Sequence, residues 1–487
     1  MSDSLLFAPG TATTAGGADD AAFAQAMLDV EAAWVRAQAD LGLAPDAAAD
    51  TVEAAATVDA IDLTAIGAQA EKGANALIPL LAALRRRVTS ADVGAARFVH
   101  RGLTSQDVID TALVLLLRRA SAATLADAEA VAANLRRLAA EHREAPMVGR
   151  TLAQHAVPYT FGLKAATWLQ GVDTAIAALR DRAGRLPVQC GGASGTLAAV
   201  GTLTAGTDVT PLELAGRFAA RLGLRPAAPW HTARLPLVEA ADAFALLADA
   251  FGKLATDVVL LSRPEIAEVA EPAAPGRGGS SAMPQKRNPV LSVLIRRTAL
   301  TVPHLIAQLH LAAALADDER PDGAWHSEWP ALAALLRLVP SAAASAAELT
   351  GGLVVHPDRM LATLTDAAPG VLSERITAVA VPLVEGATAG DAGAGTSAGD
   401  RVSAMIAAAG DGREGTARLR TALRAAVPAD ALTDPALEDL LDPARYLGSA
   451  ADLVDGVVAE SAAAAQRRTP APRRAPTDPQ PSGEEHP

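Results

Sequence analysis

Aromatic side chains are scarce in this chain of 487 residues: they make up 3% of it, although half of all residues are hydrophobic. Alanine supplies much of that apolar content. β-Sheets draw on aromatic and β-branched side chains, whereas small side chains allow helices to pack closely. We therefore predict an all-α protein, and a chain of this length can bury several hydrophobic cores.

Cysteine is also nearly absent, since Cys190 stands alone. It cannot form an internal disulfide, which fits a reducing compartment, and its apolar, glycine-flanked surroundings favour a packed residue over a nucleophile. The first residues, MSDSLLFAPG, lack a basic segment followed by an apolar core. We find no run of about 18 uncharged apolar residues, the length that a membrane span needs. These absences predict a cytoplasmic protein with no membrane partner.

The balance of charge is acidic, with a formal net charge of −13. That charge argues against nucleic acid as a partner, because nucleic-acid-binding domains carry basic surfaces. It does not exclude an anionic substrate, since the local field of a cleft matters more than the total charge.

Long amphipathic patterns dominate the chain and predict helices over 18–41, 63–88, 106–142, 154–186, 212–222, 238–262 and 290–316. We predict an N-terminal helical domain over 1–105, a central bundle of long helices over 106–355 and a C-terminal helical domain over 356–466. The stretch 385–400, rich in glycine and small residues, is expected to be a linker or lid loop. The Pro-rich, polar residues 467–487 are expected to be disordered.

The segment 276–289, GRGGSSAMPQKRNP, carries the strongest chemical signal. Its glycines and serines allow backbone N–H groups to approach a ligand, and its far side concentrates cationic and amide donors. Such a loop can hold a carboxylate and stabilise the charge that builds on it when a neighbouring carbon loses a proton. The alternative, a solvated basic turn, accounts poorly for this combination of two serines, methionine, lysine and asparagine.

This loop resembles the signature loop of the fumarase/aspartase superfamily, and two further segments resemble that superfamily's motifs in the same order. They are HRGLTSQDVIDTA at 100–112 and GRTLAQHAVPYTFG at 149–162. The resemblance implies an all-α fold with a central bundle of long helices and an enzyme that moves a proton next to a carboxylate. It also implies a homotetramer with active sites shared between subunits.

The resemblance assigns roles to individual residues. Ser280 would be the general base, and its alkoxide would need nearby donors and the Lys286 ammonium to stabilise it. Lys286 and Asn288 would hold the carboxylate as its charge doubles. His155 would be the acid, or the group that orients the other end of the substrate. The remaining residues assigned to substrate binding are His100, Arg101, Thr104, Ser105, Gln154 and Ser281.

Two more segments indicate a branch of the superfamily. PWHTARLP at 229–236 adds His231 and Arg234 to the substrate-binding set, and ERPDGAWHSEWPAL at 319–332 adds His326. Together they resemble the 3-carboxy-cis,cis-muconate cycloisomerases, which close a lactone ring on a tricarboxylate. The resemblance implies a tricarboxylate small-molecule substrate and no cofactor. The histidines are too scattered for a metal-ligand cluster, so no metal is predicted.

Two alternatives remain open from the sequence. One is a lyase of the same superfamily that releases fumarate from adenylosuccinate or argininosuccinate. The other is a binding or structural protein that kept the fold and lost the chemistry.

Overall fold

The computed structural model describes residues 6–387 and 396–468. Within them the chain is mainly helical, as predicted, with seventeen α-helices and four short strands. The predicted tail over 467–487 and the middle of the loop predicted over 385–400 lie almost wholly outside the described residues. The helices are α1 (Asp20–Asp40), α2 (Asp46–Ala55), α3 (Leu63–Ala70), α4 (Leu77–Ala91), α5 (Ser105–Glu141), α6 (Phe161–Ala183), α7 (Ala198–Thr204), α8 (Pro211–Leu222), α9 (Leu235–Leu261), α10 (Val290–Ala314), α11 (Gly323–Gly351), α12 (Pro357–Asp366), α13 (Ser373–Ala387), α14 (Ala398–Ala409), α15 (Gly412–Ala426), α16 (Asp434–Leu441) and α17 (Ala450–Arg468). The strands are β1 (Pro146–Thr151), β2 (Gln154–Thr160), β3 (Val269–Ala270) and β4 (Val354–Val355).

The chain divides into two compact units. The first unit contains residues 1–134 and 171–360, and the second contains residues 135–170 and 361–487. The helices α5 and α6 each contribute residues to both units. The finer division into four segments stays a prediction.

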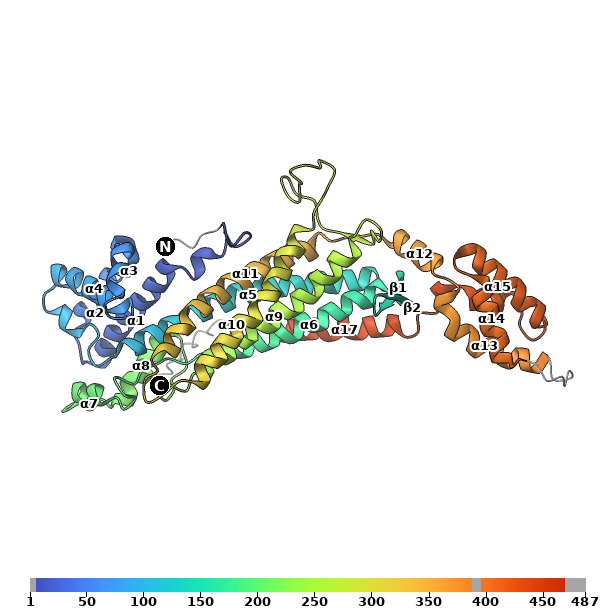
Figure 1. Cartoon of the computed structure of the whole chain (residues 1–487). Coiled ribbons are helices and arrows are strands. Elements are labelled where there is room, and N and C mark those ends of the chain that lie inside the picture. Colours follow the sequence, from blue (N-terminus) through green and yellow to red (C-terminus); the bar gives the residue numbers. More distant parts are fainter. Residues whose placement is uncertain (1–5, 388–395, 469–487) are drawn as a thin grey trace, which may run out of the picture. The chain divides into compact units, whose positions relative to one another are not determined.

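Long helices form the centre of the first unit. In Figure 1, α9, α10 and α11 run alongside one another, and these three helices pack together. Phe244, Leu247 and Phe251 of α9 and Leu335 of α11 are fully buried. Burying a large apolar side chain contributes about 1.5–3 kcal/mol, so this core supplies much of the stability of the first unit.

The first helix is positioned by its cap and by one aromatic contact. The Asp19 side chain accepts a hydrogen bond from the Ala22 N–H at 2.8 Å, which satisfies a free donor in the first turn of α1. Trp34 of α1 is fully buried and meets Phe218 of α8 edge to face at 5.2 Å between ring centroids. The sequence prediction of a helix over 18–41 is confirmed by α1.

The helix predicted over 154–186 is wrong over its first seven residues. Residues 154–160 form β2, which pairs antiparallel with β1 in the second unit, and α6 begins only at Phe161. The two-residue turn is made by Leu152 and Ala153, whose φ angles are 48° and 64°. Such turns usually carry Asn-Gly or Asp-Gly, and without those residues the sequence gives no sign of a hairpin.

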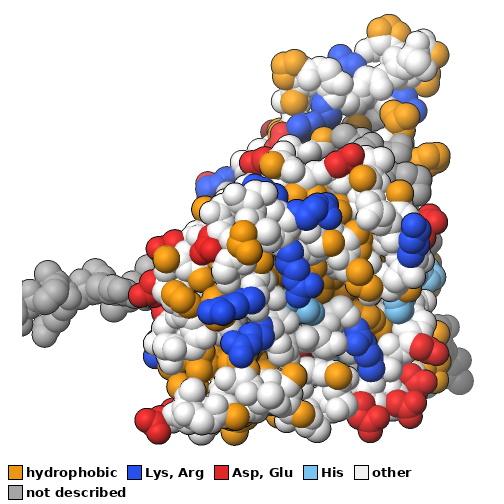
Figure 2. All heavy atoms as spheres, turned by 90° about the vertical axis from the view of Figure 1, so that its left-hand side faces the viewer, with side chains coloured by type: hydrophobic (Ala, Val, Ile, Leu, Met, Phe, Trp, Pro, Cys, Tyr) orange, Lys and Arg blue, Asp and Glu red, His pale blue; other side chains and the backbone are white. Residues whose placement is uncertain are grey.

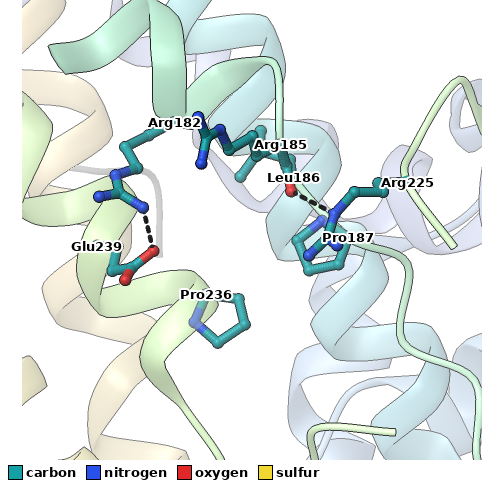
Figure 3. Close-up of a pocket in the computed structure, with 7 residues that line it drawn as sticks. All are labelled: Arg182, Arg185, Leu186, Pro187, Arg225, Pro236 and Glu239. Carbon is teal, nitrogen blue, oxygen red and sulfur yellow. Dashed lines mark hydrogen bonds and ion pairs between the residues drawn. The ribbon is translucent and has the colours of Figure 1, made fainter. Parts of the chain in front are cut away.

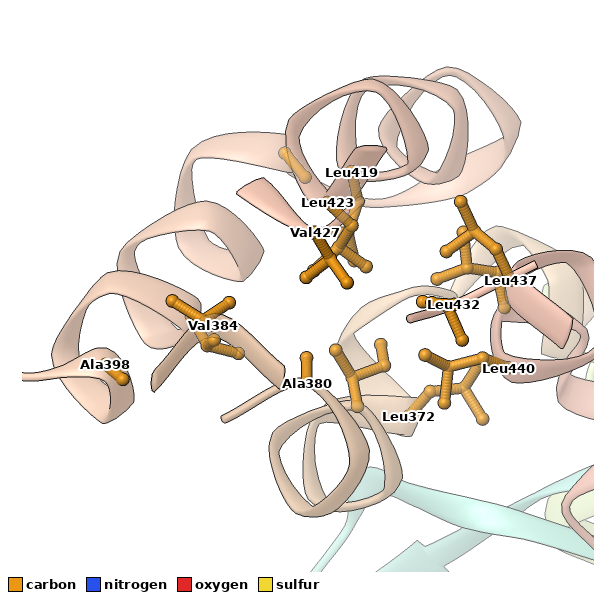
Figure 4. Close-up of a cluster of buried hydrophobic side chains, with 14 residues drawn as sticks. Leu372, Ala380, Val384, Ala398, Leu419, Leu423, Val427, Leu432, Leu437 and Leu440 are labelled. Carbon is orange, nitrogen blue, oxygen red and sulfur yellow. The ribbon is translucent and has the colours of Figure 1, made fainter. Parts of the chain in front are cut away.

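The second unit has its own hydrophobic core, which lies among α13, α14, α15 and α16. Figure 4 shows Leu372 and Ala380 facing Leu423, Leu432 and Leu440 across this core. Because these side chains are almost fully buried and contact one another, they form a hydrophobic core of their own within the second unit.

Two helices of the first unit correct an expectation from the sequence. By length and composition alone, α10 and α11 are each apolar enough to cross a membrane. The bent pair formed by α12 and residues 370–387 passes the same test when taken together. In the most apolar stretch of α11, 61% of the residues are buried inside the protein, but in that of α10 only 28% are buried. The prediction that no segment is apolar enough is therefore wrong, and α10 presents a largely uncovered apolar face.

Candidate functional site

The start of α5 carries two hydroxyl groups that meet an arginine. The Arg320 guanidinium donates to Thr104 Oγ1 at 3.0 Å and to Ser105 Oγ. It also lies over the Trp325 ring, 5.4 Å from the ring centroid. All three polar side chains are half-buried, so the group combines a partly accessible positive charge with two hydroxyls, as carboxylate binding requires.

Two residues after Ser105 on α5, the buried Asp107 carboxylate connects several segments of the chain. It accepts hydrogen bonds from the backbone N–H groups of Thr104 (3.0 Å), Gly191 (2.8 Å) and Gly192 (2.9 Å). It also contacts His231 Nε2 at 2.9 Å. His231 is itself buried, so its geometry favours a role in fixing the motif over the predicted substrate contact.

Cys190 lies in the same buried region. Burial and the nearby Asp107 carboxylate raise the pKa of the Cys190 thiol. A thiol in such surroundings stays protonated and is a poor nucleophile, which agrees with the packed role predicted for it.

One turn further along α5, Asp110 takes part in a fully buried ion-pair network. Arg234, at the N-terminus of α9, binds Asp110 through both terminal nitrogens, at 2.6 and 3.0 Å. The same guanidinium binds Glu328 of α11 at 2.6 and 3.0 Å. The Trp325 indole N–H also donates to Asp110 at 2.8 Å.

No N–H group of Arg234 remains free for a ligand. Four of its five donors reach Asp110 and Glu328, and the fifth reaches the His231 carbonyl at 3.2 Å. Burial acts to lower the pKa of Arg234, but the two carboxylates outweigh it and the pKa is raised. Burial raises the pKa of the Glu328 carboxyl, although Arg234 opposes that shift. This geometry favours a structural role for Arg234 over the predicted contact with substrate.

Three aromatic rings gather at the start of α11. Trp325 and Trp329 meet edge to face with centroids 4.8 Å apart, and the His326 ring lies 4.7 Å from Trp329. His326 Nδ1 lies 2.9 Å from the Asp322 carbonyl, an arrangement that orients the ring. Trp329 also lines a mainly apolar cavity of about 500 Å³ with Ile109 and Leu113 of α5.

His100 and Arg101 lie in the turn that precedes α5. His100 Nδ1 contacts Glu31 Oε1 at 2.7 Å, and Arg101 is exposed. A substrate-binding role for either residue stays a prediction.

The loop over 276–289 closes on itself in the first unit. The Asn288 N–H and its side-chain amide both donate to the Gly278 carbonyl, at 2.8 and 3.1 Å. Gly278 has a φ of 71°, and a Cβ there would lie 2.6 Å from the Asn288 oxygen, so glycine is required. Ser281 and Lys286 are exposed.

Ser280 sits where two backbone donors converge. The N–H groups of Ala282 and Met283 donate to Ser280 Oγ at 3.3 and 3.2 Å. Donors in this position stabilise negative charge on the oxygen. The role of Ser280 as the base, and the contribution of the Lys286 ammonium, stay predictions.

Gln154 and His155 belong to the second unit, whereas the other predicted site residues belong to the first. Both lie on β2 directly after the Leu152–Ala153 turn and are exposed. The hairpin therefore presents the two side chains outward beside Leu152, which is itself 99% exposed.

A second cavity is lined by none of the predicted site residues, although Pro236 at the end of the PWHTARLP segment borders it. Figure 3 shows its lining, in which three arginines surround a space of about 450 Å³. Arg182 is paired with Glu239 at 2.6 Å and Arg185 with Asp181 at 2.7 Å. Because two of its three positive charges are already neutralised, this cavity is a weaker candidate for binding an anion.

The surface at the N-terminal end of the first unit is locally basic despite the net negative charge. Figure 2 shows Lys and Arg side chains in the middle of this face and acidic side chains mostly toward its edges.

Among the described residues, no group of three or more His, Cys, Asp or Glu side chains could hold a metal ion.

Sequence reasoning missed Arg320, Asp107, Asp110 and Glu31. The two aspartates stand inside the HRGLTSQDVID motif, where their spacing of three places them on one helix face. Arg320 stands in the quoted 319–332 segment, but only its contact with Thr104 and Ser105 distinguishes it from an ordinary charged residue.

Comparison with known proteins gives consistent matches. A model of a family described as "Lyase" matches residues 12–303. A nitrosuccinate lyase from Streptomyces davaonensis is 45% identical over 94% of both chains. A 3-carboxy-cis,cis-muconate cycloisomerase from Bradyrhizobium diazoefficiens is 43% identical over 77% of this chain and 82% of that one. The crystal structure of 3-carboxy-cis,cis-muconate lactonizing enzyme from Pseudomonas putida matches with a TM-score of 0.80 and 35% identity, over 92% of this chain and 96% of that one.

The buried ion-pair network makes a prediction about stability. Arg234→Met should lower the free energy of unfolding by about 3–5 kcal/mol, because it leaves the Asp110 and Glu328 carboxylates buried without a partner. Arg182→Met removes an exposed pair with Glu239 and should cost no more than about 1 kcal/mol. Urea unfolding followed by circular dichroism measures both, and equal costs would contradict the assignment.

Proposed function

The chain belongs to the fumarase/aspartase family of lyases, and on that premise we propose that it converts 3-carboxy-cis,cis-muconate to 4-carboxymuconolactone. The observation that carries this proposal is the Arg320 guanidinium resting on the Thr104 and Ser105 hydroxyls, beside the aromatic group of α11. Arg320 and the aromatic group come from the segment 319–332, which resembles the cycloisomerases together with the segment 229–236. The Bradyrhizobium and Pseudomonas proteins reported above bear that activity or its synonym in their names.

A tricarboxylate substrate requires several donors. Arg320, Thr104 and Ser105 form one carboxylate-binding group on α5 and the segment before α11. The exposed Lys286 ammonium on the signature loop supplies a second, and the sequence prediction adds Asn288, whose side-chain amide donates to the Gly278 carbonyl in this structure. Arg101, exposed before α5, adds a further positive charge. Guanidinium groups bind carboxylates through paired hydrogen bonds, which suits Arg320 to the task.

The reaction closes a ring and moves one proton. A carboxylate oxygen of the substrate adds to the conjugated double bond, and the displaced electron pair moves onto the carbon next to a second carboxylate. Lys286 and Asn288 stabilise the doubly charged aci-carboxylate that results. The Ser280 hydroxyl then gives its proton to that carbon, and the Ala282 and Met283 N–H groups stabilise the oxygen left behind. His155 remains the candidate for orienting the other end of the substrate or for acting as the acid.

We also propose a cytoplasmic homotetramer whose active sites are shared between subunits. Two surfaces support it. The face of α10 is largely uncovered, with Leu300 70% exposed and Val293 51% exposed. The hairpin presents Gln154 and His155 outward beside the exposed Leu152. Residues that bind substrate yet point into solvent make sense when a neighbouring subunit completes their site.

A second candidate reaction is favoured by the relative that aligns over 94% of both chains. It is the elimination of nitrite from nitrosuccinate. Ser280 would take a proton from the carbon next to a carboxylate, the carbon–nitrogen bond would break, and nitrite would leave with the bonding pair to give fumarate. Both reactions use the same aci-carboxylate intermediate, so the signature loop serves either.

Two assays separate these reactions. Added to 3-carboxy-cis,cis-muconate, the enzyme should remove the ultraviolet absorbance of the diene, with the lactone identified by NMR. The kcat/KM for release of nitrite from nitrosuccinate should be less than about one hundredth of the kcat/KM for 3-carboxy-cis,cis-muconate. That ratio corresponds to a difference of about 2.7 kcal/mol in transition-state binding. Faster nitrite release, with fumarate formed, would reject the cycloisomerase in favour of the second candidate.

Ser280→Ala tests the proton transfer. The variant should retain its fold and lower kcat by about 10²–10⁴, the usual contribution of a general acid–base group. Ser90→Ala, an exposed serine bonded only to its own helix, serves as a matched control and should be fully active. Unchanged turnover in Ser280→Ala would remove this residue from the mechanism.

The proposed assembly is tested by sedimentation equilibrium. The wild-type chain should sediment as four copies of 49.4 kDa. Leu300→Glu places a charge on the exposed face of α10 and should shift the protein to smaller species with a parallel loss of activity. A fully active monomer would contradict both the assembly and the shared site.

A further inference from the structure

Three side chains on one face of α1 contact the turn that precedes α5. Gln38 Nε2 donates to the Phe98 carbonyl at 3.2 Å, and the Trp34 indole N–H donates to the Arg101 carbonyl at 2.9 Å. Glu31 Oε1 contacts His100 Nδ1 at 2.7 Å. Glu31, Trp34 and Gln38 are spaced by three and four residues, so they project from the same side of the helix. The turn is thereby fixed before the chain reaches Thr104 and Ser105.

The backbone of the turn is held in a conformation that it would not adopt alone. His100 has a φ of 60°, in the left-handed region that side chains other than glycine rarely occupy. The carbonyl of its neighbour Val99 accepts a hydrogen bond from Arg85 at 3.2 Å. Conformations of this kind persist when the surroundings impose them and occur preferentially at functional sites.

Glu31 is the unusual member of this set. It is 1% exposed, and its second oxygen, Oε2, is buried without a hydrogen-bond partner. A buried carboxylate with a single partner is costly, and an apolar residue or a glutamine at this position would avoid a buried charge. The cost is understandable if the negative charge is needed for the one group that it contacts, the His100 ring.

We propose that Glu31 is a positioning residue that holds His100 Nδ1–H so that Nε2 is presented to a carboxylate of the substrate. The inference rests on the proposed function, because it gives His100 the substrate-binding role predicted above. Glu31 itself does not touch the substrate. It fixes the tautomer and the orientation of the ring, as second-sphere carboxylates do for other histidines.

Two of the other charged groups near the turn are engaged elsewhere. Arg85 binds the Val99 carbonyl, and the Arg97 guanidinium lies over the Phe98 ring at 4.7 Å. Arg101 is exposed. Among the residues that the structure describes, Glu31 is the hydrogen-bond and ion-pair partner of the His100 ring.

The first measurement does not depend on activity. Hydrogen–deuterium exchange at the C2 position of each histidine, followed by mass spectrometry from pH 5 to 9, reports the state of each ring in the full-length protein. Glu31→Gln should change the exchange profile of His100 and leave those of the described histidines remote from α1 unchanged. Glu31→Asp, which keeps the charge, should restore the His100 profile in part. Glu53→Gln is the matched control, since Glu53 lies on the exposed side of α2 and pairs with Arg36.

The second measurement uses whichever of the two substrates is turned over. Glu31→Gln should raise KM by about tenfold and change kcat by less than about threefold, because His100 binds the substrate equally in the ground and transition states. His100→Gln should act similarly, and the double variant should be no worse than His100→Gln alone.

The outcomes separate the two proposals. If neither substrate is turned over, the proposed function fails and the exchange profile alone decides the role of Glu31. An unchanged His100 profile in Glu31→Gln overturns the inference, even in an active enzyme. Independent, additive effects of Glu31→Gln and His100→Gln on KM would overturn it as well.

Discussion

Two carboxylates from different long helices share one guanidinium in the interior of the first unit. Asp110 of α5 and Glu328 of α11 bind Arg234 at the start of α9, with no donor of the guanidinium left over. Because a buried charge is tolerated only in good geometry, this contact fixes the three helix ends relative to one another. The hydroxyls at the start of α5 and the aromatic rings at the start of α11 are placed by the same contact.

The sequence predicted most of this fold because most of its helices are long and regularly patterned. The helix at 18–41 and the long helix from about 106 appear nearly as predicted, as α1 and α5. The hairpin at 146–160 did not, since its turn uses Leu152 and Ala153 in place of the usual asparagine and glycine. Apolar α10 was likewise misjudged, because a segment with a few polar or charged side chains can still be apolar enough overall to cross a membrane.

The candidate site was predictable only in part, for a physical reason. Motif residues such as Ser280 and Thr104 are recognisable because their types and spacing are unusual. Arg320 and Glu31 belong to common residue types in unremarkable contexts, and their importance comes from tertiary contacts at separations of 216 and 69 residues. The same limit explains Arg234, whose charge suggests a ligand contact in the sequence, whereas its five donors are all occupied by hydrogen bonds in the fold.

The hairpin of the second unit has a consequence for how this protein can change over time. Its turn contains only two residues, and side chains alternate between the faces of a strand. Gaining or losing a single codon at Leu152–Ala153 would alter the pairing of β1 with β2, and a register shift of one residue would move Gln154 and His155 each to the other face of the ribbon. Because Leu152 and Ala153 both have positive φ angles, glycine and asparagine are the substitutions that this turn favours, whereas insertions and deletions would change the register of the two strands.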